Sequence, residues 1–346
     1  MNPNFDLSKL EFPKYFDNVE ISPVDIDKLR PNKSYECLYR NRDYQLRALL
    51  AQNDGILPAH LLEFVKCGIC NSSNSDLVMT KDGFQIRKCS SCFFIFVNPR
   101  LSKEVYVQTY NSENYGHIID TLALASHDYR KSRFGSERIE FIESYHNSSL
   151  EKTLLDIGSA SGFFIERARE KGWNSIGLEL TDSAVQFSRE KGNKVLQCTL
   201  EQANFSESSF SVITLFDVLE HLSDPLGTLR DIYKLLIPGG LIYIYVPNWN
   251  SATRLLLGES AHFIWPTHHL SYFTPKTLAM AVDICGFTIE HIETQGLDIV
   301  DWLWQVENIE NESTAGISSK INILQFLVNS AGYGKNLRLL ARKPWL

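Results

Sequence analysis

The second half of the chain is predicted to form an α/β fold, a mostly parallel seven-stranded sheet with helices on both faces. From Lys152 onward, short apolar runs typical of strands alternate with amphipathic patterns typical of helices. This alternation is characteristic of βαβ units. The first apolar run ends in a turn of small residues that leads directly into a helical pattern. Ahead of this region, four cysteines in two close pairs indicate a separate small module.

Seven strands and four helices account for the alternation. The expected strands cover residues 152–158, 174–179, 194–199, 210–217, 240–246, 287–294 and 337–343. The expected helices cover residues 163–171, 182–191, 225–236 and 275–285. The last two helices have clear starts, because Asp224 and Thr274 are favourable N-cap residues and a proline follows each of them.

The chain divides into four predicted segments, with boundaries at 1–64, 65–100, 101–150 and 151–346. The first is expected to be a helical arm, since an amphipathic pattern runs from Asn41 to Phe64. The second holds the cysteine pairs among short β-type runs, the third is a helical linker or lid, and the fourth is the α/β domain. Within that domain, residues 296–335 are predicted to form either a pocket lid or a homodimer contact.

Charge and composition favour a small molecule or a protein as substrate. The chain has 346 residues, of which 44% are hydrophobic and 22% charged, as in ordinary globular proteins. A net charge of -7 removes the main driving force for binding nucleic acid, which is phosphate neutralisation. There is no apolar run of about 18 residues and no signal-peptide pattern at the N-terminus. We therefore expect a cytoplasmic protein with no membrane partner.

The turn after the first strand indicates a ligand-binding loop. The strand ends at Asp156, and the turn contains Gly158, Ser159 and Gly162 before Phe163 opens the helix. Glycine lets the backbone turn sharply and approach a ligand where a Cβ atom would collide. The spacing is D-x-G-x-x-x-G, which differs from the G-x-G-x-x-G of a dinucleotide site. A glycine-rich turn without a ligand is the alternative interpretation.

The second strand ends in an acid, Glu179, which lies 23 positions after Asp156. This is close to the roughly 20-residue interval at which an acid meets a ribose in related folds. The two carboxylate oxygens can accept hydrogen bonds from both ribose hydroxyls. Taken with the glycine loop, Glu179 favours a nucleoside-containing ligand over an ordinary glutamate at a strand end.

The region from about residue 150 to 295 resembles one large group of Rossmann-like, class I methyltransferases that use S-adenosylmethionine (SAM). This group includes ubiquinone-biosynthesis O-methyltransferases and many enzymes that modify sugars and natural products. The resemblance rests on the glycine loop, on the motif from Phe216 to Pro225, on Pro238-Gly239-Gly240 and on Val246-Pro247-Asn248. It is specific for the class of enzyme and does not identify the substrate.

The resemblance implies a cofactor-binding role for several residues. The glycine loop would wrap the amino-acid portion of SAM, with Asp156 orienting its ammonium group. Asp217 and Val218 would contact the methionine side of the cofactor. Leu200 and Glu201 would contact its adenine. Relatives often carry an aspartate where this chain has Thr199, so the adenine contact departs from the family pattern.

Residues 265–273 form the candidate methyl-acceptor segment. They are similar to the Glu-His segment of sugar C-methyltransferases, with His268 in place of the acid. Methyl transfer requires a positioned nucleophile and often a base, and histidine can remove a proton near neutral pH. We therefore select His269 and Tyr272 as catalytic candidates, with His221 as a further histidine. A packing or hydrogen-bonding role for His269 is equally compatible with the sequence.

The four cysteines have the spacing of a closed zinc site. Cys67 and Cys70 form one C-x2-C pair, Cys89 and Cys92 form the other, and eighteen residues separate the pairs. Four thiolates complete a tetrahedron and leave no position for a catalytic water, which indicates structural zinc. Free or redox-active cysteines are the alternative. The residues that follow resemble the zinc-binding module of sugar methyltransferases, which implies that the ribbon helps to shape the acceptor pocket.

Three functions therefore remain after the sequence analysis. The first is a methyltransferase acting on an O, N or C nucleophile of a sugar nucleotide or secondary metabolite. The second is an RNA methyltransferase, which the acidic charge and the absence of a basic run on the ribbon disfavour. The third is a catalytically inactive SAM-binding scaffold, which the intact Gly158, Gly162 and Glu179 disfavour.

Overall fold

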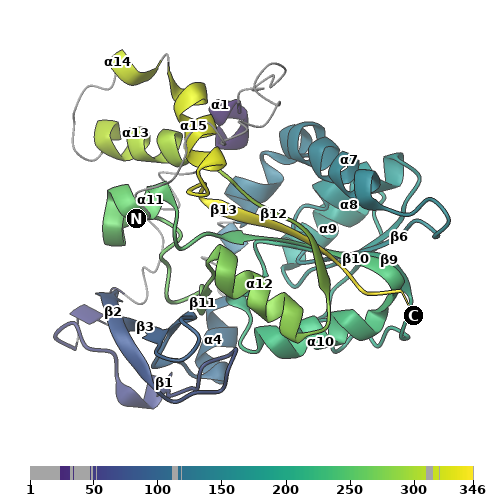
Figure 1. The fold of residues 1–346 in the computed structure, drawn as a ribbon. Helices are drawn as coiled ribbons and strands as arrows, with labels where there is room; N and C mark the ends of the chain where they lie inside the picture. The colour runs from purple at the N-terminus through teal and green to yellow at the C-terminus, as the bar shows by residue number, and fades with distance from the viewer. Residues whose placement is uncertain are drawn as a thin grey trace, which may run out of the picture.

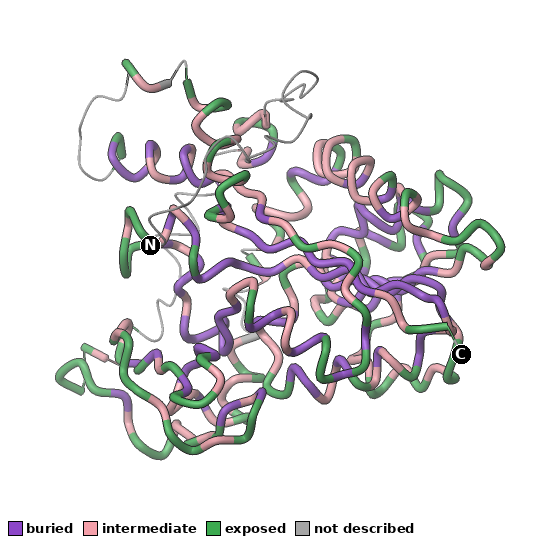
Figure 2. The backbone as a smooth tube through the Cα atoms, viewed as in Figure 1, coloured by how far each residue is buried: buried purple, intermediate pink, exposed green. Residues whose placement is uncertain are grey.

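The computed structural model describes residues 24–31, 34, 47, 50–51, 53–110, 116–117, 119–308, 315–318 and 320–345. Figure 1 shows a central twisted sheet with helices on both sides and a smaller β-rich module beside it, formed by the purple and blue part of the chain. Buried residues gather along the central strands, whereas the outer turns and helix faces are exposed (Figure 2).

The central sheet has the seven strands that the sequence predicts, in the order β12-β13-β10-β9-β6-β7-β8. The strands are β6 (Thr153–Ile157), β7 (Asn174–Leu178), β8 (Val195–Leu196), β9 (Phe210–Phe216), β10 (Leu236–Pro247), β12 (Thr288–Gln295) and β13 (Asn336–Arg342). Every pairing is parallel except those of β13, which is antiparallel to both neighbours. The carboxyl ends of β6, β7 and β9 therefore meet at one edge, where such sheets bind ligands.

Two hydrophobic layers hold helices against the sheet. Successive side chains of a strand point to opposite faces of the sheet, and helices cover both faces. Leu155 and Ile213 therefore pack on one side, and Leu154 and Val212 on the other. The first layer contains α10 (Pro225–Leu235) and α12 (Pro275–Ile284). The second contains α7 (Ser136–Tyr145), α8 (Phe163–Glu170) and α9 (Asp182–Glu190).

The helix starts that the sequence indicates are confirmed. Asp224 caps α10, with its carboxylate accepting a hydrogen bond from the Gly227 amide at 2.9 Å. Thr274 caps α12 in a reciprocal capping box with Thr277. These caps satisfy amides that have no partner inside the helix. The caps also fix the residues at which the preceding segments end and α10 and α12 begin.

The cysteine module is not closed within residues 65–100. Its sheet has the order β11-β4-β3-β2, and the fourth strand, β11 (Ser271–Tyr272), comes from the candidate acceptor segment. Ser271 pairs with Phe96, and Tyr272 with Ile95. The other strands are β2 (Ser75–Lys81), β3 (Phe84–Cys89) and β4 (Ile95–Val97), beside a short pair of β1 (Leu62–Glu63) and β5 (Arg100–Leu101). The predicted ribbon is therefore joined to the α/β domain by a shared sheet.

A hydrophobic core of its own fills the space between this module and the α/β domain. Phe84 and Ile86 from β3 pack with Trp249, Phe263 and Tyr272 from the segment after β10. Each of these side chains is buried. Movement of the ribbon would therefore disturb the segment that carries the predicted acceptor residues.

The predicted linker at 101–150 has two parts with different roles. The first contains α4 (Lys103–Tyr110), a π-helical turn η5 (Asp120–Leu124), α6 (His127–Arg130) and a second π-helical turn η6 (Lys131–Gly135). The second is α7, whose Ile139 and Ile142 are fully buried against the sheet. Since α7 covers one face of the central sheet, it belongs structurally with the α/β domain, contrary to the predicted boundary at 151.

Three other expectations about local structure need correction. The helical pattern that ends at Phe64 is interrupted, because Leu62–Glu63 form β1 and pair with β5. The described part of the arm contains the short helix α1 (Ile26–Leu29), isolated helical positions at 34, 47 and 50–51, and the 3-10 turn η4 (Ala59–Leu61). Much of the arm before residue 50 lies outside the described residues. The strand expected at 194–199 is reduced to β8, and the one expected at 240–246 is extended to Leu236 through a register shift.

The segment between the last two strands is helical where it is described. It contains α13 (Asp298–Asn308), α14 (Ala315–Ser318) and α15 (Ile321–Ser330), and Figure 1 shows them stacked beyond one end of the sheet near α11 (Ala252–Leu257). Buried Asp298 ties this group together, since its carboxylate accepts hydrogen bonds from the amide and hydroxyl of Thr253 at 2.9 and 2.7 Å. No helix within the described ranges is long and apolar enough to cross a bilayer.

Candidate active site

The glycine loop closes tightly over the end of the central strands. The amides of Gly158 and Ser159 both donate to the carbonyl of Leu178, at 2.8 and 2.9 Å. Gly158 and Gly162 have φ values of +74° and +75°, and a Cβ atom on either would lie within 2.4 Å of Val218 or within 1.9 Å of Ser188. Both glycines are thus required by conformation and by space. The glycine loop therefore lies at the end of the strand, which is where the sequence predicts that a ligand binds.

Asp156 lies beneath this loop and is almost fully buried. Its carboxylate accepts a hydrogen bond of 2.6 Å from the Thr214 hydroxyl. Burial raises the pKa of Asp156 to about 7, although the Thr214 hydrogen bond and the positive charge of Arg138 oppose the rise. Its ionisation is therefore sensitive to any cation that binds above the loop.

Glu179 lies at the rim of the loop, directly after β7. Its Oε2 atom accepts from the Ala160 amide at 2.8 Å, and Oε1 accepts from the amides of Leu180 and Thr181 at 2.8 and 2.9 Å. These bonds fix the carboxylate beside the glycine loop with its side chain only partly buried. The two motifs, which lie 23 positions apart in sequence, are thus in direct contact.

The side chains of two loop residues, Ser159 and Phe163, do not lie where they would contact a ligand directly. Ser159 is buried and its side chain points back toward Gly177 on β7, within 2.4 Å of where a Cβ atom there would lie. Its hydroxyl has no hydrogen-bond partner within the described chain. Phe163 is buried at the start of α8 in the second hydrophobic layer. We conclude that only the backbone of Ser159 faces the space above the loop.

The residues expected near the adenine follow β8. Leu200 and Glu201 line a surface pocket together with Asp231 and Lys234 of α10. Leu200 also packs against the first hydrophobic layer. The structure therefore places the predicted adenine residues on the α10 side of the third strand.

Asp217 and Val218 follow β9, next to the glycine loop. Asp217 has a φ of +56°, and its carboxylate accepts a long hydrogen bond of 3.4 Å from the Asn336 side chain. The residue is exposed, yet protein surrounding its carboxyl group raises the pKa of Asp217, against the effect of Arg138, Lys335 and Arg130. Val218 packs over Gly158. The positive φ at Asp217 marks a turn that aims its side chain away from the strand.

Two arginines near Asp217 were not selected from the sequence. Arg138 on α7 stacks over Phe216, with its guanidinium carbon 4.0 Å from the ring centre, and lies 5.0 Å from the Tyr245 ring. Arg130 ends α6 and is close enough to Arg138 for the two charges to interact. Neither arginine has an ion-pair partner within the described residues. The helical pattern around them resembles that of many surface helices, so the sequence offers no specific signal.

On the acceptor side, the structure brings together His221, His269 and Glu220. One ligand atom of each lies within 4.8 Å of the others, a spacing that would also allow a metal ion to bind. The two imidazole rings meet edge to face, with centres 4.6 Å apart. His221 lies in the short helix η7 (Leu219–His221) after β9, whereas His269 comes from the candidate acceptor segment. The sequence predicts both histidines but gives no reason to place them in contact.

Hydrogen bonding fixes the orientation of His221. Its Nδ1 atom lies 3.0 Å from the His268 carbonyl, so Nδ1 donates and Nε2 is left facing the Glu220 carboxyl at 3.9 Å. Burial lowers the pKa of His221 to about 4. The ring is therefore neutral near physiological pH, and Nε2 can accept a proton or a hydrogen bond.

Glu220 is the functional candidate that the sequence analysis missed. Its side chain is 1% exposed, and neither carboxylate oxygen has a hydrogen-bond partner among the residues that the structure describes. Burial raises the pKa of Glu220 well above its ordinary value, and the nearby charge of Asp217 adds to the rise. A buried, unsatisfied carboxyl group is costly and commonly marks a functional site. Glu220 directly precedes His221, so it belongs to the motif from Phe216 to Pro225 from which His221 was selected.

The remaining acceptor residues support this cluster. Tyr272 on β11 is buried against Trp249, and its ring centre lies 6.4 Å from that of His269. Tyr106 of α4 contacts the carbonyls of both His221 and His268, at 2.6 and 2.9 Å. The Tyr106 hydroxyl of α4, within the linker or lid predicted at 101–150, thus joins the two segments that carry the histidines.

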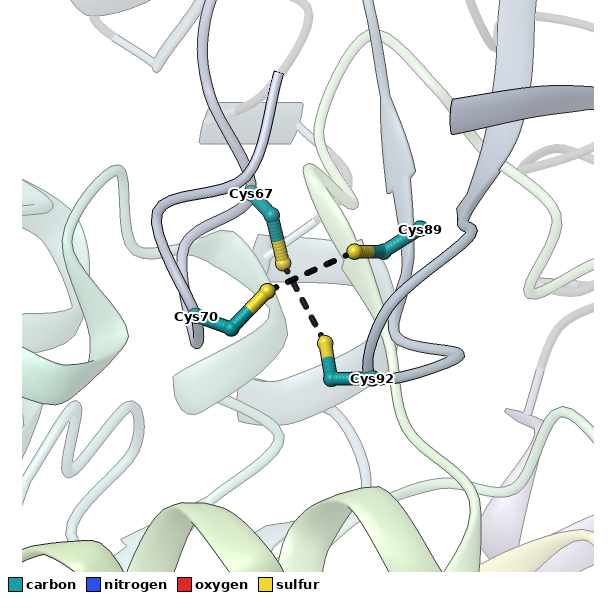
Figure 3. Close-up of side chains that lie close together, drawn as sticks. All are labelled: Cys67, Cys70, Cys89 and Cys92. Carbon is teal, nitrogen blue, oxygen red and sulfur yellow. Dashed lines mark hydrogen bonds between the residues drawn. The ribbon is translucent and has the colours of Figure 1, made fainter. Parts of the chain in front are cut away.

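The four ribbon cysteines converge on one point, as Figure 3 shows. Sulfur atoms of Cys67 and Cys92 are 3.4 Å apart, as are those of Cys70 and Cys89, and all four lie within 4.8 Å of one another. A disulfide requires about 2.05 Å, and these cysteines are free. A tetrahedral zinc ion with bonds of about 2.3 Å needs sulfurs slightly farther apart. The arrangement therefore fits four thiolates around one ion.

Comparison with known proteins agrees with this geometry. A methyltransferase-domain family matches residues 124–292. The ubiquinone biosynthesis O-methyltransferase of Idiomarina loihiensis is 30% identical over 46% of this chain and 70% of its own length. That of Erwinia tasmaniensis is 29% identical over 46% and 71%. A SAM-dependent methyltransferase structure from Archaeoglobus fulgidus has a TM-score of 0.46 at 21% identity, covering 62% of this chain and 94% of its own.

The family match begins before the first central strand and includes α7, the glycine loop, Glu179 and the two η7 residues Glu220 and His221. It ends within β12 and thus covers the sheet edge where these groups meet. The cysteine ribbon lies outside the matched region. The chain belongs to the class I SAM-dependent methyltransferases.

Proposed function

We propose that this enzyme transfers a methyl group from SAM to a small molecule. The observation that carries the proposal is the meeting of His221, His269 and buried Glu220 next to the predicted cofactor loop, on segments that are joined through β11 to the cysteine ribbon. The named relatives act as O-methyltransferases in ubiquinone biosynthesis, which supports a hydroxyl acceptor first. Nitrogen and carbon nucleophiles of a sugar nucleotide or secondary metabolite remain within the same proposal.

The cofactor half of the site uses the shape of the backbone and four ionisable side chains. SAM, when bound, supplies an activated methyl group on a sulfonium centre. Glu179 binds the ribose hydroxyls, and the backbone of Gly158, Ser159 and Gly162 shapes the space for the amino-acid portion. Asp217 faces the ammonium group and Arg138 faces the carboxylate, since these opposite charges lie together beside the loop. Asp156 supports the ammonium group indirectly from beneath the loop, where burial raises its pKa.

The acceptor half holds the proton that methyl transfer releases. His269 is the proposed base, because its ring lies against neutral His221 and beside a carboxyl group with a raised pKa. His221 orients that ring, and Glu220 offers a buried site to which a proton can pass. Tyr272 acts chiefly by fixing the segment, since its side chain is buried against Trp249. Positioning of the acceptor accounts for most of the expected rate.

The ribbon is proposed to bind one structural zinc ion through Cys67, Cys70, Cys89 and Cys92. The fit of the four sulfurs supports this assignment, and no ligand position is left for catalysis. Zinc would hold β3 and β4 together and thereby fix the partner strand β11, which begins only two residues after His269. The ribbon at 65–100 is therefore assigned to the acceptor half, together with η7 and residues 265–273 of the α/β domain.

Calorimetric titration with S-adenosylhomocysteine tests the cofactor assignment. Metal-replete wild-type protein should bind saturably, and Glu179→Ala should bind at least about tenfold more weakly, because hydrogen bonds to a charged group contribute about 1.5–3 kcal/mol. Glu190→Ala, at an exposed position on α9, is the control and should bind normally. Well-folded wild-type protein that does not bind the ligand would contradict the proposed function.

An acceptor screen then tests the small-molecule assignment. Wild-type protein is incubated with SAM and with nucleotide sugars, phenols or unmodified RNA in separate reactions, and S-adenosylhomocysteine formation is measured. Turnover with a nucleotide sugar or phenol, lost in His269→Ala, is the expected result. Turnover with RNA alone would favour the RNA methyltransferase instead. Binding of the cofactor product without turnover in any reaction would favour an inactive scaffold.

A further inference from the structure

Two partly buried arginines beside the cofactor loop have no acidic partner. Arg130 and Arg138 form no ion pair within the described residues, whereas most other partly buried arginines are paired. Those pairs are Arg30 with Asp301, Arg100 with Glu63, Arg133 with Glu137, Arg167 with Glu170, and Arg342 with Glu290. Buried Arg338 is also paired, with Glu293. A cation held away from water without a partner is costly. The site therefore has an excess of positive charge that a bound anion would neutralise.

The local charges do not balance when protein groups alone are considered. Arg130 is close to Arg138, Arg30 and Asp217, all of which affect its charge. Arg30 is already engaged with Asp301 at 2.5 Å. Asp217 is a carboxylate that lies near enough to both Arg130 and Arg138 for their charges to interact. Burial, followed by the two neighbouring cations, lowers the pKa of Arg130 to about 10, and the group remains charged at neutral pH.

Arg130 is held so that the end of its side chain can reach a ligand. Its Nε atom donates to the Ser126 hydroxyl at 2.6 Å, and that hydroxyl is itself bonded to the Leu122 carbonyl. The two terminal amino groups form no hydrogen bond within the described chain. One edge of the guanidinium group is thus fixed by protein, and the other edge is available for two parallel hydrogen bonds to an oxyanion.

Arg130 lies near the glycine loop and near Arg30, which contacts α13. Three residues earlier on α6, His127 contacts Ser161 of the glycine loop at 3.1 Å and Glu166 of α8 at 2.9 Å. On its other side, neighbouring Arg30 joins α13 through Asp301. The segment at 296–335 is the one that the sequence associates with an acceptor lid. The helix that ends at Arg130 therefore contacts the glycine loop, and Arg30, which affects the charge of Arg130, contacts α13.

SAM carries only one carboxylate, and Arg138 is better placed to receive it. Arg138 stacks on Phe216, directly before Asp217, and also influences Asp156 beneath the loop. Arg130 does not contact these groups through any ring or hydrogen bond. Once Arg138 is assigned to the cofactor, Arg130 still lacks an anion.

We propose that Arg130 binds an oxyanion group, a phosphate or a carboxylate, on the methyl acceptor. The inference rests on the proposed function and narrows its substrate class to anionic small molecules. Neutral phenols and quinols would then be poorer substrates for this enzyme than acceptors that carry a phosphate or carboxylate. The guanidinium group of Arg130 would hold the oxyanion of the acceptor in a fixed place. It would thereby set the position of the acceptor's nucleophile, which faces the histidine cluster.

The test uses full-length protein saturated with S-adenosylhomocysteine and titrated with inorganic pyrophosphate or, separately, with benzoate at constant ionic strength. Wild-type protein should bind one of the two probes saturably, and the one that binds identifies the oxyanion as phosphate or carboxylate. Arg130→Met should bind that probe at least tenfold more weakly, and Arg130→Lys should show an intermediate loss, because charge is kept while the fork is removed. Arg230→Met, at an exposed position on α10, should resemble wild type.

The same variants are titrated with S-adenosylhomocysteine alone. Arg138→Met should lose affinity for it, whereas Arg130→Met and Arg130→Lys should stay within about threefold of wild type. The proposal is overturned if both probes fail to bind the loaded wild-type protein, or if either Arg130 variant loses as much cofactor-product affinity as Arg138→Met. Failure of wild type to bind S-adenosylhomocysteine would instead refute the proposed function, so the two failures are distinguishable.

Discussion

The cofactor half and the acceptor half of this enzyme are built in different ways. The cofactor half comes from one continuous stretch, in which the glycine loop and Glu179 follow successive strands and bond directly to each other. The acceptor half is assembled from distant segments: the ribbon, α4, η7 and β11. Local sequence therefore determines the first half, whereas the second half depends on long-range pairing. Damage to each half should have separate consequences.

The largest expected effect is on the glycine loop. In Gly162→Ala, the new Cβ atom would lie within 1.9 Å of the Ser188 hydroxyl and 2.9 Å of Asn193. We predict at least a hundredfold loss of S-adenosylhomocysteine affinity in calorimetry. Gly172→Ala is the matched control, because Gly172 has a similar φ of +83° but open space around it. That variant should lose only about 1–2 kcal/mol of stability from the left-handed backbone, with affinity unchanged; equal affinity in both variants would refute the steric explanation.

Loss of the ribbon metal should affect the acceptor half alone. Cys67→Ser removes one of four ligands, and structural zinc contributes about 10–16 kcal/mol of binding energy in small domains. We predict that metal analysis finds about one zinc per wild-type chain and far less in the variant. Methyl transfer should fall more than tenfold while S-adenosylhomocysteine affinity stays within about threefold.

Cys285→Ala, a buried cysteine that is not part of the four-cysteine cluster, serves as the control and should keep its zinc. A ribbon variant that loses zinc but keeps full turnover would separate the ribbon from the acceptor site. About two metal ions per chain in wild type, with one lost in His269→Ala, would show that the cluster of Glu220, His221 and His269 also binds a metal.

The buried His221 should make stability depend on pH. Its pKa is about 4 in the folded protein and about 6.5 when unfolded. As the pH falls below 6.5, the unfolded chain binds a proton that the folded state does not bind, so stability is lost between about pH 6.5 and 4. In urea unfolding from pH 7 to 5, wild type should lose about 1–2 kcal/mol more than His221→Gln. Equal losses in the two proteins would show that His221 does not titrate in this range.

The smallest expected effect concerns the hydroxyl that joins α4 to the two histidine segments. Tyr106→Phe removes hydrogen bonds to the His221 and His268 carbonyls, and a typical hydrogen bond contributes about 0.5–1.5 kcal/mol. We predict a loss of about 1 kcal/mol in urea unfolding and a rise of a few-fold in the KM for the acceptor. Tyr129→Phe, which loses its contact with the Asp25 amide, should show a similar stability loss without the change in KM.

The same contrast explains how far the sequence could be interpreted. The glycines, Glu179 and the four cysteines were predictable because their chemistry depends on short, fixed spacings. The pairing of Ser271 with Phe96 was not, since β11 has two residues and its partner lies far away in the sequence. Leu62–Glu63 form a strand although their surroundings have a helical pattern, because they pair with Arg100–Leu101. Arg138 was missed because nothing in its helix shows that it faces the cofactor loop.

A crystal structure with bound S-adenosylhomocysteine tests the central claim most directly. The division into two halves predicts that the ribose hydroxyls contact Glu179, that the carboxylate contacts Arg138, and that the sulfur faces the cluster of His221 and His269. Ligand density at the loop but with the sulfur facing away from these histidines would contradict the proposed acceptor half. Density away from the glycine loop would contradict the account as a whole.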